Sequence, residues 1–277
     1  MTHMRPKKSL GQNFLKSEIV LRKIIEAGEI KPDDIILEIG PGKGALTSKL
    51  LENIHFAGAK QGLVIAVEKD RELFEFLKIK FEREIKKRSL VLIHDDILKF
   101  NISAPNLETR TYKIIANIPY NITGAILKKF LTEKHQPELM VLMIQHEVAI
   151  RILARDDKES LLSISVKAYG KPKMVAKVDK RYFSPAPKVN SAIIAIKNIS
   201  RGIFENNKIN EKEFWKIVKT GFAHKRKKLS SNLREVCQRD TLTSLGNKRA
   251  ENLSLQDWIG LAKLNFYPGN DTINSKN

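Results

Sequence analysis

Short runs of aliphatic residues alternate with segments of helical periodicity along most of the 277-residue chain. The runs are apolar at nearly every position, so they are predicted to be strands buried on both faces. They cover residues 35–39, 63–68, 90–93, 113–116 and 139–143. Helical spacing follows these strands at residues 45–51, 71–87, 124–131 and 147–154. Strands separated by helices can pair in parallel, so the sequence predicts an α/β fold with a mainly parallel sheet covered on both faces.

Two later segments also carry strand signals. Residues 163–178 and 191–196 are rich in β-branched and aliphatic side chains, and Pro172 is expected to interrupt the first of them. Both segments are therefore expected to contain strands.

The pattern changes between residues 201 and 210, where periodicity is weak, and residues 211–264 are helical in pattern throughout. We therefore predict a large domain over 1–200, which begins with a basic arm, and a small all-helical domain over 201–268. The last residues, 269–277, are expected to form a disordered tail.

The charge is the strongest compositional signal. Fifty Lys and Arg residues against 31 acidic residues give a formal net charge of +19. Such an excess indicates a polyanionic partner, although a lysine-rich surface without any ligand is the alternative. The chain has neither a run of about 18 apolar residues nor a secretory signal, and its lone Cys237 cannot form an internal disulfide. A cytoplasmic protein without a membrane partner is therefore expected, and the lack of heptads favours a monomer.

A glycine-rich loop, residues 40–44, follows the first predicted strand and precedes a helix. Glycine lets the backbone turn tightly and approach a ligand closely, so Gly40 and Gly42 are candidate cofactor contacts. The next predicted strand ends in Glu68, whose carboxylate can accept hydrogen bonds from ribose hydroxyls. A dinucleotide site would usually have glycine at position 45 and tolerates the Ala45 found here, so that alternative stays open, as does a turn without a ligand.

Asp96 follows the third predicted strand and is expected at the same edge of the sheet. Its carboxylate can accept a hydrogen bond from the amino group of an adenine ring in a cofactor. Aspartate after a strand is also typical of a turn or a helix cap. Its place in series with Gly40 and Glu68 favours the cofactor contact.

The motif Asn117-Ile118-Pro119-Tyr120 follows the fourth predicted strand. An exocyclic adenine nitrogen is a poor nucleophile because its lone pair is delocalised into the ring. The side-chain oxygen of Asn117 and the carbonyl of Ile118 are suitable acceptors for the amino hydrogens. Pro119 would stiffen the turn, and Tyr120 offers a flat face for stacking the base. A methyl sulfonium donor is already reactive, so alignment can supply most of the catalysis and no metal is needed; the alternative is a plain β-turn.

An uninterrupted basic run, Lys225-Arg226-Lys227-Lys228, lies within the helical C-terminal part. It suits a phosphate backbone and is our candidate RNA-binding segment. The alternative is a solvated helix face.

Four motifs together resemble the ribosomal RNA adenine N6-dimethyltransferase family. They are Leu10-Gly11-Gln12-Asn13-Phe14-Leu15, the loop from Glu38 to Gly44, Asn117 to Tyr120, and Phe183-Ser184-Pro185-Ala186-Pro187-Lys188-Val189-Asn190-Ser191. The resemblance runs from residue 10 to about residue 264. It implies a two-domain enzyme with a Rossmann-like class I methyltransferase core that uses S-adenosylmethionine.

The resemblance also assigns roles to individual residues. Those that match cofactor contacts of the family are Asn13, Leu15, Gly40, Glu68, Asp96 and Asn117. Phe183 matches an aromatic residue that stacks on the target adenine opposite the tyrosine, here Tyr120. Without the resemblance, Phe183 would be interpreted as a core residue before a proline-rich loop.

The family has two main branches. One dimethylates two adjacent adenines near the 3′ end of small-subunit (16S) rRNA during assembly of a 30S-type particle, and the other modifies a large-subunit adenine and confers antibiotic resistance. Residues 222–229 and 249–258 are similar to the small-subunit branch. The large-subunit enzyme remains an alternative, as does a non-catalytic assembly or transcription factor with the same fold.

Overall fold

The computed structural model describes residues 6–7, 10–54, 62–101, 111–238, 242–243 and 245–266. Its contacts divide the chain into two compact units. The first unit comprises Met1–Ala149 and Gly170–Ile199, and the second comprises Ile150–Tyr169 and Ser200–Asn277. The second unit is therefore discontinuous in sequence.

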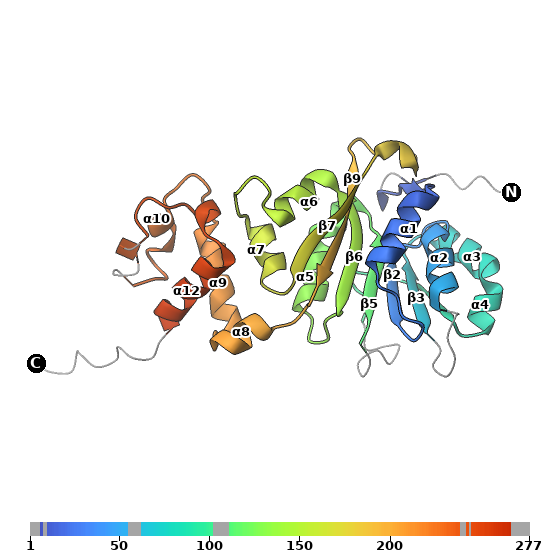
Figure 1. Ribbon diagram of the computed structural model, residues 1–277, viewed down its shortest axis with the longest axis horizontal. Helices are drawn as coiled ribbons and strands as arrows, with labels where there is room; N and C mark the ends of the chain where they lie inside the picture. The colour runs from blue at the N-terminus through green and yellow to red at the C-terminus, as the bar shows by residue number, and fades with distance from the viewer. Residues whose placement is uncertain are drawn as a thin grey trace, which may run out of the picture. The chain divides into compact units, whose positions relative to one another are not determined.

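A seven-stranded sheet forms the centre of the first unit (Figure 1), in the order β4-β3-β2-β5-β6-β9-β7. The strands are β2 (Ile35–Ile39), β3 (Leu63–Glu68), β4 (Leu90–His94), β5 (Lys113–Asn117), β6 (Leu139–Gln145), β7 (Lys171–Val178) and β9 (Ser191–Lys197). The strands from β4 to β6 pair in parallel, whereas β9 runs antiparallel to both of its neighbours. The predicted mainly parallel sheet is confirmed.

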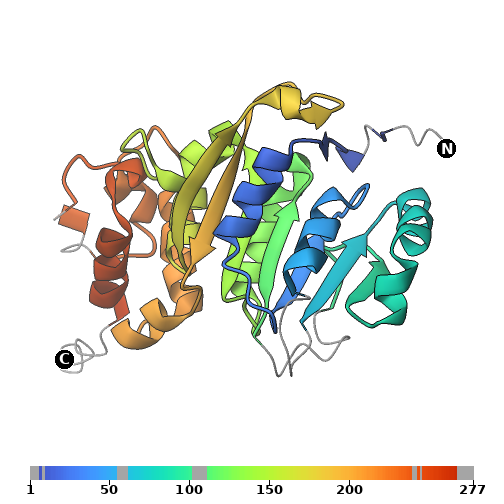
Figure 2. The ribbon, with the colours of Figure 1, turned by 45° about the vertical axis from the view of Figure 1, so that its right-hand side comes forward.

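Helices cover both faces of this sheet (Figure 2), as expected for parallel strands that are apolar at nearly every position. They are α1 (Glu18–Ala27), α2 (Ala45–Ile54), α3 (Arg71–Lys80), α4 (Glu82–Lys86), α5 (Thr123–Thr132) and α6 (His146–Leu153), which continues into the second unit. A two-stranded antiparallel pair joins β1 (Phe14–Leu15) to β8 (Phe183–Ser184). The helix predicted over 71–87 is interrupted at Phe81, whose buried ring packs against Gly44.

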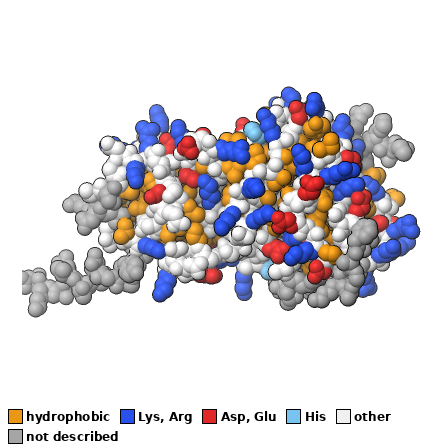
Figure 3. All heavy atoms as spheres, viewed as in Figure 1, with side chains coloured by type: hydrophobic (Ala, Val, Ile, Leu, Met, Phe, Trp, Pro, Cys, Tyr) orange, Lys and Arg blue, Asp and Glu red, His pale blue; other side chains and the backbone are white. Residues whose placement is uncertain are grey.

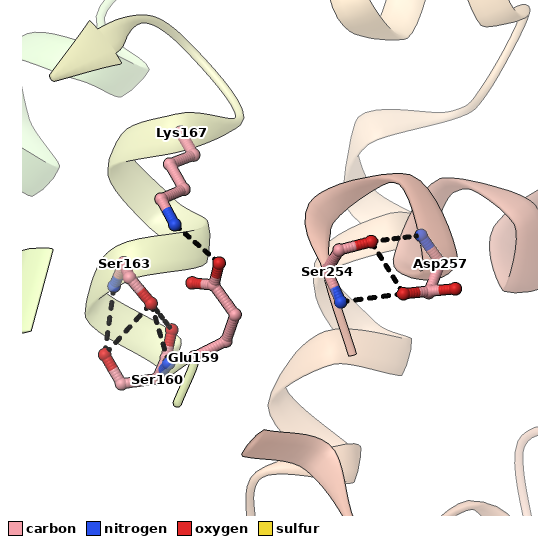
Figure 4. A network of polar contacts seen from close by, with 6 residues as sticks. All are labelled: Glu159, Ser160, Ser163, Lys167, Ser254 and Asp257. Carbon is pink, nitrogen blue, oxygen red and sulfur yellow. Dashed lines mark hydrogen bonds and ion pairs between the residues drawn. The ribbon is translucent and has the colours of Figure 1, made fainter. Parts of the chain in front are cut away.

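The strand signal over 163–178 was wrong in its first half. Residues Leu161–Lys167 form the helix α7, which begins at a reciprocal cap between Ser160 and Ser163 (Figure 4). The strand β7 begins only at Lys171 and contains Pro172 without a break. A proline is tolerated there because β7 is an edge strand that pairs only with β9.

The second unit is helical in the part that the structure describes. It contains α7, α8 (Gly202–Asn207), α9 (Glu211–Gly221), α10 (Leu229–Leu233), η5 (Ala250–Asn252) and α12 (Leu255–Phe266). The segment of weak pattern, 201–210, holds the short helix α8. Ser254 and Asp257 form a side-chain cap at the start of α12 (Figure 4). The expected tail, 269–277, lies outside the described residues.

The predicted boundary near residue 200 coincides with the point where the chain enters the second unit for the second time. Residues 150–169, however, belong to that unit rather than to the large domain. The ring of Tyr169 lies 5.6 Å from that of Phe204 and 6.0 Å from that of Trp215, and its hydroxyl bonds to Glu211. These contacts join segments far apart in sequence, which no local pattern reveals.

None of the helices within the described ranges is long and apolar enough to cross a membrane.

Candidate functional site

A cleft opens at the carboxyl edge of the parallel strands of the first unit. Segments after β2, β3, β4 and β5 line it, together with residues 10–15. Every predicted cofactor residue contributes to this lining, namely Asn13, Leu15, Gly40, Gly42, Glu68, Asp96 and Asn117. Ile118, Pro119 and Tyr120 line it as well. The fold therefore brings together motifs that are separated by more than a hundred residues in the chain.

The glycine loop needs its glycines. Gly40, Gly42 and Gly44 have φ angles of +65°, +60° and +75°, a region that other residues rarely adopt. A Cβ atom at Gly42 would lie 3.0 Å from the ring of Phe14, and one at Gly44 would lie 2.5 Å from the ring of Phe81. The loop therefore presents bare backbone to the cleft, with the chain folded closely around it.

Glu68 ends β3, and backbone donors fix its carboxylate. Its Oε2 accepts the N–H of Gly42 at 3.1 Å, and its Oε1 accepts the N–H of Asp70 at 2.8 Å. Burial raises the pKa of Glu68, while these N–H donors act in the opposite direction. Each oxygen keeps a second lone pair, so the carboxylate is oriented and can still accept hydroxyl groups of a ligand.

Asp96 forms a turn and also faces the cleft. Its Oδ1 accepts the N–H of Leu98 at 3.0 Å, and its Oδ2 pairs with the Lys69 ammonium group at 2.9 Å. The hydrogen bond from Lys69 lowers the pKa of Asp96, which therefore stays ionised. The turn role that the sequence left open is present, and it leaves the carboxylate among the cleft-lining groups.

Glu38, the last acidic residue before the glycine loop, is only 1% exposed, and its Oε2 has no hydrogen-bond partner within the described part of the chain. Burial raises the pKa of Glu38 to about 8 from an ordinary value of 4.5. The side chain is therefore protonated at neutral pH in the folded protein. The sequence motif pointed to this residue but did not reveal its protonation state.

This protonation state predicts a pH effect on stability. Between about pH 5 and 8 the unfolded chain loses the Glu38 proton while the folded chain keeps it, so the free energy of unfolding should fall as pH rises. In Glu38→Gln this loss should be absent, with a difference of at most about 1.4 kcal/mol per pH unit. Urea unfolding of both proteins from pH 5 to 8 measures the difference. Glu52→Gln, at an exposed position of α2, is the control, and parallel curves for wild type and Glu38→Gln would contradict the prediction.

Asn117 ends β5 and has its amide group fixed. Its Nδ2 donates to the backbone carbonyl of Asn13 at 3.1 Å, and the Nδ2 of Asn13 donates to the carbonyl of Gly11 at 3.1 Å. Because the nitrogen is engaged, the side-chain oxygen of Asn117 is the free acceptor, and no residue within the described ranges donates to it. This is the group that the sequence proposed as an acceptor for an amino group.

The hydroxyl of Tyr120 is hydrogen-bonded to a residue whose role the sequence did not reveal. It lies 2.5 Å from Oγ of Ser191, which is fully buried at the start of β9. Burial raises the pKa of Tyr120, so the phenol stays neutral. Ser191 closes the motif that begins at Phe183, and its position as the last member of that motif was the available signal.

Phe183 does not lie in the cleft wall. It is 2% exposed, pairs with Leu15 between β8 and β1, and packs into the core of the first unit. In this structure Phe183 is a core residue. Its ring would have to become exposed before it could stack on a base. Its role as a stacking residue stays a prediction.

The basic run lies in the second unit, in the loop between α9 and α10. All four of its side chains, Lys225, Arg226, Lys227 and Lys228, are exposed. Asn232 fixes the preceding turn, since its Nδ2 donates to the carbonyls of Gly221 and His224. The run is therefore not the solvated helix face considered as an alternative.

The cleft fits S-adenosylmethionine. Bare backbone at Gly40 and Gly42 allows close approach of a ligand, while Glu68 and Asp96 supply oriented acceptors for hydroxyl and amino groups. Fold and cleft together define a class I S-adenosylmethionine-dependent methyltransferase.

Known proteins narrow this class further. The family described as ribosomal RNA adenine dimethylase matches residues 3–265. A protein of Dehalococcoides mccartyi (strain CBDB1) named ribosomal RNA small subunit methyltransferase A is 40% identical over 264 residues, covering 92% of this chain and 87% of its own. A Fusobacterium nucleatum protein of the same name is 36% identical, covering 93% and 97%. This chain therefore belongs to the ribosomal RNA adenine dimethylase family, as predicted.

Two solved structures share the fold. A dimethyladenosine transferase from Plasmodium falciparum superposes with a TM-score of 0.73 at 27% identity, covering 90% of this chain and 95% of that one. The 23S rRNA methyltransferase ErmE gives a TM-score of 0.72 at 24% identity, covering 91% and 99%. At 24% identity the second likeness concerns the fold alone.

Proposed function

We propose that this protein uses S-adenosylmethionine to dimethylate the N6 amino groups of two adjacent adenines near the 3′ end of small-subunit rRNA in an assembling small subunit. Relatives named for small-subunit RNA match it over nine tenths of its length. The observation that carries the proposal is the free Oδ1 of Asn117, which is held in the cleft by the bond from Nδ2 to Asn13.

The target adenine needs hydrogen-bond acceptors for its amino group more than it needs a general base. Oδ1 of Asn117 and the carbonyl of Ile118 accept the two amino hydrogens and thereby favour a more tetrahedral, more nucleophilic nitrogen. Pro119, with φ at −60°, fixes the turn that directs both groups. Tyr120 stacks on the base, and its bond to Ser191 keeps the ring in place. Alignment of these groups supplies most of the rate enhancement.

The cofactor residues complete the arrangement. S-adenosylmethionine supplies an electrophilic methyl group when bound, so no residue of the chain has to form a covalent bond. Glu68 accepts the ribose hydroxyls and Asp96 the adenine amino group, while Gly40 and Gly42 allow close approach. Asn13 and Leu15 cover the bound molecule. Phe183, once uncovered, would stack on the target adenine opposite Tyr120.

Two other functions compete with this proposal. The large-subunit enzyme shares the fold, as ErmE does, but the relatives at 36–40% identity are named for the small subunit. A non-catalytic assembly factor would have no use for a complete glycine loop and Asn117 motif. An Asn117→Ala protein that restored every phenotype of a deletion strain would favour the assembly factor.

The deciding experiment uses labelled S-adenosylmethionine and separated ribosomal subunits from an unmethylated strain. Mass spectrometry then maps the labelled nucleosides. Dimethyladenosine in small-subunit RNA is the expected result. Label confined to large-subunit RNA would identify the resistance enzyme, and cofactor binding without any label would favour the assembly factor.

The basic loop is proposed to contact RNA phosphates. Lysine and arginine side chains are spread over much of the face drawn in Figure 3, but residues 225–228 concentrate four cations in one exposed loop. Replacing all four with glutamine should weaken RNA binding and reduce the slope of log K against log salt by roughly 3–4. Filter binding from 50 to 200 mM salt measures both quantities. A variant with four other exposed lysines replaced, Lys78, Lys86, Lys87 and Lys99, is the charge-matched control, and an equal loss in that variant would contradict a local role for the loop.

A further inference from the structure

The wall formed by residues 10–15 is held at its two ends in different ways. At one end, β1 pairs with β8, and the N–H of Lys16 donates to the carbonyl of Tyr182 at 2.9 Å. At the other end, the segment belongs to no helix or strand that packs on the sheet. There it is attached by two side chains, those of Lys7 and Gln12, which both reach Asp70.

Asp70 receives these two side chains on separate oxygens. Lys7 Nζ lies 2.8 Å from Oδ1, and Gln12 Nε2 lies 2.8 Å from Oδ2. The backbone N–H of Lys7 donates in turn to Oε1 of Gln12 at 2.8 Å, which closes the network on itself. The carboxylate of Asp70 is only 3% exposed, whereas Lys7 is 39% exposed. We call Lys7, Gln12 and Asp70 the clasp.

The clasp is also connected to the cleft through the backbone of Asp70. Its N–H donates to Oε1 of Glu68, the acid proposed to hold the ribose. Asp70 therefore contacts both the segment that carries Asn13 and the carboxylate of Glu68, and both of these line the cleft. A buried carboxylate that loses its partners is costly, so the contacts from Lys7 and Gln12 favour the closed position of the wall.

Asp70 has a second, purely structural role that must be separated from the first. It is the N-cap of α3, and its side chain accepts the N–H of Glu72 at 3.0 Å. Loss of a cap lowers stability by about 1 kcal/mol wherever the helix lies, and it would not by itself affect a ligand. Lys7 and Gln12 take no part in that cap. Lys7 Nζ also lies 3.2 Å from the exposed carboxylate of Glu72, so Glu72→Gln is measured beside the Lys7 and Gln12 variants to separate that pair from the clasp.

We propose that Lys7, Gln12 and Asp70 are positioning residues that hold the N-terminal wall of the cleft over bound S-adenosylmethionine and slow its dissociation. The identity of the ligand rests on the proposed function; the clasp itself rests on the contacts above. Every methyl transfer requires a fresh cofactor and release of the used one, so the strength of the clasp also governs exchange of the cofactor between transfers.

The test measures cofactor binding without RNA. Lys7→Ala/Gln12→Ala should bind S-adenosylmethionine at least tenfold more weakly by calorimetry, through faster dissociation in stopped flow. The backbone amides of residues 11–15 should exchange hydrogen faster in the same variant. Lys86→Ala, which removes an exposed ammonium–carboxylate pair in α4, is the matched control.

The outcomes separate the clasp from the proposed function. A wild-type protein that binds no S-adenosylmethionine would overturn the proposed function. Wild-type binding with unchanged affinity and unchanged exchange in the double variant would overturn the clasp. If the double variant does not fold, Lys7→Ala and Gln12→Ala are measured singly, since each leaves Asp70 with its other side-chain donor, and threefold or greater weakening in each is then expected. Weakening in Asp70→Ala, which removes the cap, without any weakening in the Lys7 and Gln12 variants would assign the effect to the helix cap and would also overturn the clasp.

Discussion

Replacing Asn117 with alanine is expected to lower kcat for adenine methylation by about 10²–10³-fold, the usual effect of removing one oriented hydrogen-bonding group from a transition state. The substitution removes the free acceptor in the cleft. It also removes the donor to the carbonyl of Asn13, so S-adenosylmethionine should bind a few-fold more weakly. Single-turnover rates with unmethylated small subunits, together with calorimetry of the cofactor, measure the two effects separately.

Asn117→Asp is the informative companion of this variant. The carboxylate keeps an acceptor but cannot donate to Asn13, and its second oxygen would face the Asn13 carbonyl. It should therefore lose at least as much cofactor affinity as alanine and retain more of the methylation rate. Equal rates for the two variants would mean that the acceptor contributes nothing beyond the contact to Asn13. In that case Ile118 and Tyr120 would carry the orientation of the base.

Replacing Gly221 with valine is expected to destabilise the second unit by roughly 2–3 kcal/mol through overpacking. Gly221 is the last residue of α9, and a Cβ atom there would lie 2.4 Å from Cη2 of Trp258 and 3.0 Å from Cδ1 of Leu229. Trp258 is fully buried, so its ring has no room to withdraw. Both tryptophans of the chain, Trp215 and Trp258, belong to this unit, so fluorescence-detected urea unfolding reports on it selectively.

Gly260 provides the opposite control for Gly221. It lies inside α12, and a Cβ atom there would meet nothing within 4 Å. Gly260→Ala should therefore stabilise the unit by about 0.5–1 kcal/mol, because alanine loses less conformational freedom in a helix. If Gly221→Val had as little effect as Gly260→Ala, the close contact with Trp258 would not limit the packing of this unit.

The sheet could be predicted because its signal is local. A strand that is apolar at nearly every position is recognisable one segment at a time, and all five parallel strands were found within one or two residues of their ends. Residues 161–167 misled the prediction because a short apolar run has no period that separates helix from strand. The feature that distinguishes the helix is the cap at Ser160. It is recognisable only in the structure, where the Ser160 side chain accepts the N–H of Ser163 and the Ser163 side chain accepts the N–H of Ser160.

The part of the site that could be predicted consists of residues that a motif and their position at the end of a strand identify. Glu68 and Asn117 end a strand, Gly40 and Asp96 come just after one, and parallel strands end at a common edge. The contacts of Ser191 and Asp70 could not be found in this way, because their partners lie 71 and 63 residues away, respectively. The motif that ends at Ser191 marked that residue without revealing its bond to Tyr120. The burial of Phe183 was equally invisible, since a stacking aromatic and a core aromatic look alike in sequence.

The interrupted course of the second unit affects how the protein is made. Residues 150–169 are synthesised before the residues that they contact. The partner of the Tyr169 hydroxyl is Glu211, and the N–H of Glu159 donates to the carbonyl of Glu251, so both contacts can form only after those later residues are made. The first unit already has its last strand when the chain reaches Lys197, so it can fold during synthesis while that apolar segment stays without partners. A chain that stops short of α12 is therefore expected to expose a folded sheet attached to an orphaned segment, the kind of surface that chaperones and proteases recognise.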